Sequence, residues 1–243
     1  MNAIEITNLT KKFKERTAVD SLYLSVKKGE MFSLLGQNGA GKTTTIKMLS
    51  GLLSPTGGDA VLMGNSVVKN PNAVKRVINV SPQETAVAPK LSVKENLEMV
   101  AQIYGSGRQE AIRKADEMLA AFGLTDRAKD RANALSGGLQ RRLSIAMALI
   151  SNPDILFLDE PTLGLDVRAR RDLWTFIGTL KGKITIILTT HYLEEADALA
   201  DRIGIMHNGR MQVTGTAEEI KSMTGKASLE DAFLMLTEEE VVS

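Results

Sequence analysis

The stretch MFSLLGQNGAGKTTT, residues 31–45, decides the fold of this 243-residue chain. A short apolar run ends at Gly36, a glycine-rich loop follows, and Lys42 and Thr43 lead into a segment with the apolar spacing of a helix. The loop matches the pattern G-x-x-x-x-G-K-[ST] in the context that this pattern requires, after a strand and before a helix. Glycines let backbone N–H groups approach a polyphosphate closely, because a Cβ there would collide with it. The stretch predicts a nucleotide site; the alternative is an ordinary glycine-rich turn.

Two side chains of this loop suit a bound nucleotide. The helix that follows presents its positive end to the phosphates. Lys42 is expected to reach the β- and γ-phosphates as a point charge, and the Thr43 hydroxyl is expected to ligate Mg²⁺. We therefore expect a complex of nucleotide and Mg²⁺ on this loop.

The composition bounds the class of protein. The chain has 43% hydrophobic and 24% charged residues, which excludes a disordered or fibrous protein. Its formal net charge of +1 gives no electrostatic reason to expect a nucleic-acid partner, and none is expected. With no cysteine, it has neither disulfides nor a thiolate metal site. No apolar run approaches the roughly 18–20 residues of a membrane span and no secretory signal is present, so we expect a cytoplasmic chain without a span of its own.

The apolar patterns outside the loop predict an α/β fold. Alternating apolar residues over residues 1–35 predict an N-terminal antiparallel β part. The continuous apolar runs 155–158 and 184–188 are typical of strands buried on both faces of a mostly parallel sheet. Between about residues 90 and 150 the pattern is helical, and Ser92 with Glu95 forms a capping box. The expected fold is thus a mixed, mostly parallel sheet with flanking helices, an antiparallel β part and an inserted helical block.

Acidic and histidine side chains follow the two buried strands. Asp159 and Glu160 come directly after the first strand, at the carboxyl end, where ligands bind in open α/β sheets. Asp159 is expected on the Mg²⁺ side, and Glu160 is expected to act as general base on the attacking water. His191 follows the second strand at the same sheet edge, where it can contact a γ-phosphate or water. The alternative is a pair of exposed acids that merely cap a strand.

Two further features could contact a nucleotide. Ser136, Gly137 and Gly138 open a helix, and a hydroxyl with free N–H groups at a helix start can bind an anion. Phe13 lies in a polar loop before the glycine-rich stretch, where it could stack on an adenine ring. A partly buried core phenylalanine explains the spacing of Phe13 equally well.

Taken in order, these motifs closely resemble the ATP-binding subunit of ABC transporters, along almost the whole chain. Phe13 matches the adenine-stacking aromatic of that family. The remaining matches are Walker A at residues 36–44, the Q-loop glutamine Gln83, the signature at residues 135–138, Walker B at residues 155–159 followed by Glu160, the D-loop at residues 163–166 and the switch histidine His191.

The resemblance implies an ATPase in which two such domains pair head-to-tail, and each ATP lies between Walker A of one and the signature helix of the other. It implies catalytic roles for Glu160, His191, Gln83 and Lys42, with Mg²⁺ held by Thr43, Gln83 and Asp159. The implied ATP-binding residues are Phe13, Gly36, Gln37, Asn38, Gly39, Ala40, Gly41, Lys42, Thr43 and Thr44, with Ser136, Gly137 and Gly138 contacting the ATP of the partner protomer. Every half-site element is present, so a symmetric homodimer is chemically sufficient.

The signature departs from the common family pattern at one position. Leu139 follows Gly138 where a glutamine is usual, and Gln140 comes one place later. With this variant and the ending SLEDAFLMLT, the chain is most similar to the bacterial ABC-2 export branch, which includes drug, antibiotic and sodium extrusion ATPases. That branch implies a separate polytopic transmembrane permease, with this chain held peripherally on the inner face of the cell membrane.

The expected organisation is a single ABC ATPase domain over residues 1–243. Residues 1–82 and 151–215 form the ATP-binding core with the antiparallel β part, residues 83–150 the helical signature subdomain, and residues 216–243 short C-terminal helices. About 90 residues separate Walker A from the signature, which leaves no room for the long coiled coil of DNA-repair ATPases. A soluble ATPase of iron–sulfur cluster assembly, acting with a cytosolic scaffold, remains the alternative.

Overall fold

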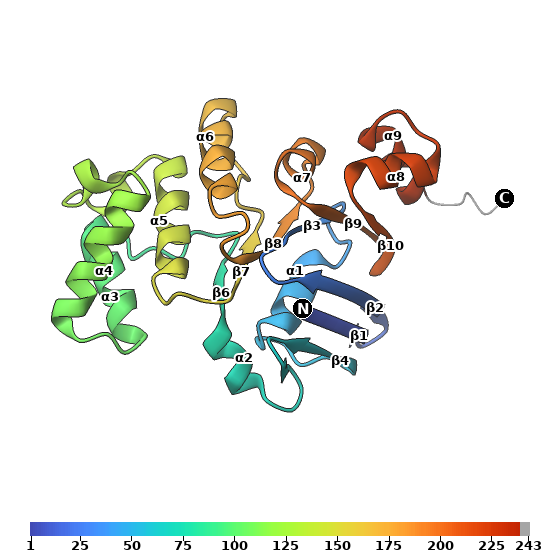
Figure 1. Cartoon of the computed structure of the whole chain (residues 1–243), viewed down its shortest axis with the longest axis horizontal. Coiled ribbons are helices and arrows are strands. Elements are labelled where there is room, and N and C mark those ends of the chain that lie inside the picture. Colours follow the sequence, from blue (N-terminus) through green and yellow to red (C-terminus); the bar gives the residue numbers. More distant parts are fainter. Residues whose placement is uncertain (239–243) are drawn as a thin grey trace.

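A six-stranded sheet forms the centre of the computed structural model, which describes residues 1–238 (Figure 1). All neighbouring strands run parallel except the edge pair β10–β9. Strands β3, β7 and β8 are buried at every residue, as their continuous apolar sequences require. The predicted mostly parallel sheet is therefore confirmed. In spatial order its strands are β10 (Arg210–Gly215), β9 (Arg202–His207), β3 (Met31–Leu35), β8 (Thr185–Thr190), β7 (Ile155–Asp159) and β6 (Ile78–Ser81).

A second, antiparallel sheet packs below the first and confirms the predicted N-terminal β part. Its strands, in the order β2-β1-β4-β5, are β2 (Arg16–Lys27), β1 (Asn2–Phe13), β4 (Gly57–Leu62) and β5 (Asn65–Ser66). Helix α1 (Lys42–Leu49) lies between the two sheets (Figure 1). Its Ile46 shares one hydrophobic core with Ile4 of β1 and Phe157 of β7. Helix α1, which directly follows the glycine-rich loop, is thus fixed between the two packed sheets.

Helices cover the opposite face of the parallel sheet. Leu156 and Leu158 of β7 point into a core that includes Leu143 and Leu173 of these helices. Because successive residues of a strand face opposite sides, β7 contributes to both cores. Helices α5 (Gly137–Leu149), α6 (Val167–Gly178) and α7 (Leu193–Leu199) lie on this face. Helices α3 (Val93–Ile103) and α4 (Arg108–Ala121) extend the same core beyond α5, and the short 3-10 turns η1 (Thr125–Arg127) and η2 (Ala132–Ala134) connect α4 to α5.

The predicted helical block consists of α3, α4 and α5, which stand together at one end of the molecule (Figure 1). Helix α3 begins with the expected capping box, in which Ser92 accepts from the backbone of Glu95 and Glu95 reaches back to Ser92. At the other end, α8 (Ala217–Thr224) and α9 (Leu229–Thr237) pack beside β9. Residues 239–243 of the predicted C-terminal segment lie outside the described residues.

Helix α2 (Pro71–Val77) is absent from the sequence prediction. It has only seven residues and buries a single side chain, Val74. Such a short helix shows no usable apolar period, and only Pro71 at its first turn indicates a helix start. The element precedes β6 and does not contribute to the site.

Candidate nucleotide-binding site

Four adjacent parallel strands end at the same edge of the sheet. Their register aligns Leu35 with Thr190, Thr189 with Asp159, and Ser81 with Leu158. The segments that leave these strands therefore begin side by side. They carry the glycine-rich loop, His191, Glu160 and Gln83. Chain positions more than 150 residues apart thus meet at one point, as expected for the carboxyl edge of an α/β sheet.

The glycine-rich loop is held by backbone contacts on both sides. The N–H of Gly36 donates to the carbonyl of Thr190 at 3.3 Å, which ties the loop to the neighbouring strand. Gly41 precedes α1 with a φ of 107°, and a Cβ there would lie 2.6 Å from the carbonyl oxygen of Ala18. Only glycine meets both conditions, because that φ disfavours other residues and the space is occupied. The loop shape is therefore a consequence of its sequence.

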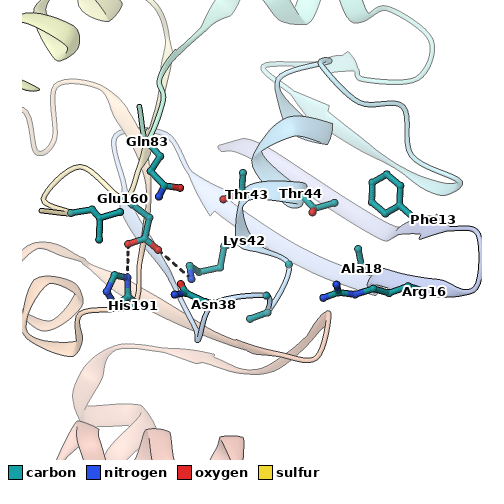
Figure 2. A pocket seen from close by; sticks show the side chains of 14 residues that line it. Phe13, Arg16, Ala18, Asn38, Lys42, Thr43, Thr44, Gln83, Glu160 and His191 are labelled. Carbon is teal, nitrogen blue, oxygen red and sulfur yellow. Dashed lines mark hydrogen bonds and ion pairs between the residues drawn. The ribbon is translucent and has the colours of Figure 1, made fainter. Parts of the chain in front are cut away.

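Lys42 and Glu160 form a buried ion pair at the centre of this edge, and the half-buried His191 contacts the same carboxylate (Figure 2). Lys42 Nζ lies 3.3 Å from Glu160 Oε1, and His191 Nδ1 lies 2.7 Å from Glu160 Oε2. Lys42 Nζ also donates to the carbonyl oxygens of Gly36 at 2.7 Å and Gln37 at 3.2 Å. The side chains of Lys42 and Glu160 are only 5% and 7% exposed, so each charge compensates the cost of burying the other.

Asp159 lies next to the hydroxyl of the loop threonine. Thr43 Oγ1 donates to Asp159 Oδ1 at 3.3 Å, and Thr189 Oγ1 donates to the same oxygen. The carboxylate of Asp159 is thereby oriented toward the start of α1. A threonine hydroxyl and a carboxylate are hard oxygen donors, the kind of ligand that Mg²⁺ prefers in phosphate sites. These side chains fit the magnesium that the sequence predicts.

The backbone of Glu160 adopts a left-handed conformation, with a φ of 49°. Its N–H is held by Thr189, through both the carbonyl and the hydroxyl oxygen at 3.1 Å. Such a conformation costs a non-glycine residue about 1–3 kcal/mol and persists only where the surroundings enforce it. This arrangement turns the carboxylate toward Lys42 and His191 at the point where the strand ends.

A cleft of about 500 Å³ opens in front of this group. Phe13 lies at its far end, 46% exposed, and the Lys11 Nζ lies 5.1 Å from the centre of its ring (Figure 2). Gln83 and Arg16 also line the cleft, as do Ala18 and Leu163. Sequence reasoning did not single out Arg16, which belongs to the strand after the hairpin of Phe13 and carries no motif. The predicted residues that line the cleft are Phe13, Asn38, Gly39, Ala40, Gly41, Lys42, Thr43, Thr44, Gln83, Glu160 and His191.

The signature residues are placed elsewhere. Ser136 caps α5, its hydroxyl accepting from the backbone N–H of Leu139 at 3.4 Å. Gly137 and Gly138 start α5 and face the D-loop and α6 of the same chain. Within the described residues, none of the three lines the cleft. Leu139, at the position of the usual glutamine, packs against the helical core.

Two buried ionisable residues near the site carry no signal in the sequence. Arg141 of α5 is 4% exposed and donates to backbone carbonyls of the Q-loop, and burial lowers the pKa of its guanidinium. Glu195 of α7 is fully buried and accepts from Trp174 Nε1 at 3.0 Å. Burial raises the pKa of the Glu195 carboxyl. No motif marks either residue, because their partners are backbone groups and distant side chains.

Comparisons with known proteins agree with this geometry. The family model described as ABC transporter matches residues 19–163. The chain is 45% identical over 225 residues to the daunorubicin/doxorubicin resistance ATP-binding protein DrrA of Streptomyces peucetius, covering 92% of this chain and 68% of that protein. It is 40% identical over 223 residues to the linearmycin resistance ATP-binding protein LnrL of Bacillus subtilis, covering 91% and 72%. A solved structure of the ATP binding subunit of an ABC transporter superposes with a TM-score of 0.85 at 31% identity, over 97% of this chain and all of the other.

The P-loop core, the family match and the relatives define the class: the chain belongs to the ABC transporter family. It is an ATP-binding subunit and an ATPase of that family. The resemblance inferred from the sequence motifs is therefore confirmed, as is the predicted fold class.

Proposed function

We propose that this chain powers the export of drug-type organic compounds, by hydrolysing ATP at the cleft in front of Lys42, Glu160 and His191. The observation that carries the proposal is the contact of the buried Glu160 carboxylate with both Lys42 and His191, beside the glycine-rich loop. A carboxylate held there can accept a proton from water that attacks the γ-phosphate. Lys42 supplies positive charge to the β- and γ-phosphates, and His191 orients the carboxylate and the water.

The remaining predicted residues complete the site. Residues 36–44 cradle the phosphates through backbone N–H groups, and Phe13 stacks on the adenine. Thr43, Asp159 and Gln83 would hold Mg²⁺, which neutralises the charge that develops on the phosphates. The pairing of the Thr43 hydroxyl with Asp159 supports this donor set.

The signature residues require a second ATPase protomer in this proposal. Ser136, Gly137 and Gly138 lie at the start of a helix with free N–H groups, away from the cleft of their own chain. A head-to-tail homodimer brings them to the ATP of the partner protomer, where the helix dipole favours the γ-phosphate. The division into a core of residues 1–82 and 151–215, a helical subdomain of residues 83–150 and the C-terminal helices belongs to the same proposal.

The transport role rests on the relatives. Both named bacterial relatives are ATP-binding proteins of resistance to organic antibiotics, and this chain matches most of their length. Among residues 1–238, the structure contains no helix of the length and apolarity that crossing a bilayer demands. From the transporter family and these relatives we infer that the export path belongs to a separate polytopic transmembrane subunit, with this chain held peripherally on the inner face of the cell membrane. The relatives lend no support to the iron–sulfur assembly alternative.

The first test is Glu160→Gln, which removes the general base but preserves the size of the side chain. Loss of a general base slows turnover roughly 10²- to 10⁴-fold, whereas ATP-induced dimerisation should persist. ATP hydrolysis and light scattering with Mg²⁺–ATP measure the two effects. Glu194→Gln is the matched control, because Glu194 is an exposed acid on α7 outside the cleft. Turnover near that of the wild type in Glu160→Gln would contradict the assignment.

The second test addresses the partner. A tagged Glu160→Gln chain is expressed in its native host, membranes are solubilised gently, and co-purifying proteins are identified. A polytopic membrane protein in near-equal amount supports the exporter. A soluble scaffold protein, with nothing from the membrane, would favour the assembly ATPase instead.

A further inference from the structure

Arg141 connects the signature helix α5, on which it lies buried, to the Q-loop and to Glu160. Its side chain is 4% exposed and points away from solvent toward the carboxyl edge of the sheet. Nη1 donates to the carbonyl oxygen of Pro82, and Nη2 donates to that of Gln83, each at 2.5 Å. Nη2 also lies 3.4 Å from the carbonyl oxygen of Glu160. One side chain thus contacts the Q-loop and the backbone of the proposed general base.

The acceptors make this contact unusual for a buried arginine. A buried guanidinium is ordinarily paired with a carboxylate, because an isolated charge in the interior is costly. Here the direct acceptors are backbone carbonyls, while the carboxylates of Asp159 and Glu195 act on Arg141 only through longer-range attraction. Burial lowers the pKa of the guanidinium, and these two carboxylates offset part of that effect. The buried guanidinium of Arg141 therefore serves to fix the main chain of the Q-loop and of Glu160 through hydrogen bonds to their carbonyl oxygens.

Each of the contacted segments needs support. Gln83 is exposed and follows the end of β6, so few neighbours fix its backbone. Glu160 has the left-handed backbone described above, which requires enforcement from outside. The N–H of Glu160 is held by Thr189. Its carbonyl oxygen accepts from the N–H of Leu163 at 3.2 Å and from Arg141 Nη2 at 3.4 Å. Arg141 therefore adds a side-chain donor to the restraint on this strained residue.

Arg141 lies within about one turn of the end of the signature, on the same helix. Ser136 caps α5, and Arg141 is the fifth residue after it. A helix of this kind moves as a rigid rod, so a displacement at its N-terminus is transmitted to the guanidinium. A contact made on the signature by a partner protomer would reach Gln83 and Glu160 through Arg141.

We propose that Arg141 is a positioning residue for ATP hydrolysis, which couples the signature helix to the Q-loop and to the peptide of Glu160. The proposal rests on the function assigned above, since it assumes that Glu160 is the general base. Arg141 does not line the cleft and contacts only the backbone of Gln83 and Glu160 behind it, so its expected effect is on the placement of these two residues and not on ATP binding.

The test is Arg141→Met, which retains the length of the side chain and removes every donor. A displacement of the base by about 1 Å lowers turnover by up to roughly 100-fold, so we expect kcat to fall 10- to 100-fold. The KM for ATP and the affinity of the protomer for ATP should change by less than about threefold. Hydrogen exchange of the peptide that contains residues 82–84 should become faster. Arg141→Lys retains one charged donor and should have a kcat between those of the wild type and Arg141→Met. If Arg141→Met does not fold, the lysine variant tests the proposal in its place.

The matched control is Arg142→Met on the same helix. Arg142 is the adjacent arginine, is partly exposed, and does not line the cleft. Its loss should leave kcat and the exchange of residues 82–84 unchanged. A folded Arg141→Met protein with the kcat of the wild type overturns the proposal. The proposal is also overturned if both arginine variants lose kcat in proportion to their loss of unfolding free energy, because the effect would then be one of stability alone.

Measuring Glu160→Gln in the same assay separates the two hypotheses. An inactive Glu160→Gln together with a fully active Arg141→Met refutes the positioning role alone. A fully active Glu160→Gln refutes the proposed function, whatever the arginine variants do.

Discussion

The contact between Lys42 and Glu160 predicts a measurable coupling in the stability of the chain without nucleotide. Lys42→Met leaves the carboxylate of Glu160 buried with His191 as its remaining polar partner. Glu160→Gln leaves the ammonium of Lys42, which still donates to the carbonyls of Gly36 and Gln37. The double variant contains neither charge. We therefore expect the double variant to lose less unfolding free energy than the sum of the losses of the two single variants.

The geometry sets the size of this coupling. Across the 3.3 Å between Nζ and Oε1, the Coulomb attraction at an effective dielectric constant of about 20 is roughly 5 kcal/mol. Removing one partner of a buried pair costs about 3–5 kcal/mol, and the retained contact with His191 favours the lower end for Lys42→Met. For Glu160→Gln we expect a loss of about 1–2 kcal/mol, because the ammonium retains two acceptors. We expect a coupling free energy of about 2 kcal/mol, smaller than the Coulomb attraction because the cost of desolvating both charges offsets part of it, and within the range of residues in direct contact.

Urea denaturation of the four proteins, without nucleotide and Mg²⁺, measures the cycle. Trp174 is the single tryptophan, and its contact with buried Glu195 makes its fluorescence a reporter of unfolding. Lys42→Met combined with Glu194→Gln is the control and should be additive, because Glu194 is exposed. Additivity of Lys42→Met and Glu160→Gln within about 0.5 kcal/mol would refute the reasoning, since it would mean that the two charges do not stabilise one another.

Two further predictions concern buried groups. Because burial raises the pKa of Glu195, the folded protein keeps this proton to higher pH than the unfolded chain, and stability falls as the pH rises above the ordinary value of about 4.5. Glu195→Gln cannot ionise, so its unfolding free energy should fall less between pH 5 and pH 8; equal losses in both proteins would contradict this. A Cβ at Gly36 would lie 2.4 Å from the carbonyl oxygen of Met206, so Gly36→Ala should lose about 1–3 kcal/mol and bind ATP poorly in a titration. At Gly178 an added Cβ would meet no atom of a neighbouring element within 4 Å among residues 1–238, so Gly178→Ala should be neutral or stabilising. Equal losses at both glycines would exclude the clash as the cause.

The sequence predicted the parts of the site that depend on local chemistry. Gly41 requires glycine because of its φ and its contact with Ala18, and this requirement is visible as a motif. The carboxylates after the run at residues 155–158 could be placed at a sheet edge, because a strand buried on both faces implies a parallel sheet. The cap at Ser136 was equally readable, since a serine before a helical pattern satisfies free N–H groups.

Other features depended on contacts between distant parts of the chain. Arg141 looks in the sequence like one of several basic residues on a helix, and its partners at Pro82 and Gln83 are almost 60 residues away. Glu195 looks like an ordinary acid in the first turn of α7, although it is fully buried against Trp174. Neither environment can be read from spacing, because burial of a charge depends on which elements pack over it.

Local sequence is enough to identify the kind of chemistry, because the backbone or a bound phosphate imposes the residue types of the loop. Glycines, a lysine and a hydroxyl must follow one another there, since each acts within a few residues of the next. The side chains that restrain one another across the sheet edge follow instead from the way the chain folds. The pairing of Lys42 with Glu160, and the hold of Arg141 on the Q-loop, arise because strands far apart in the chain end side by side.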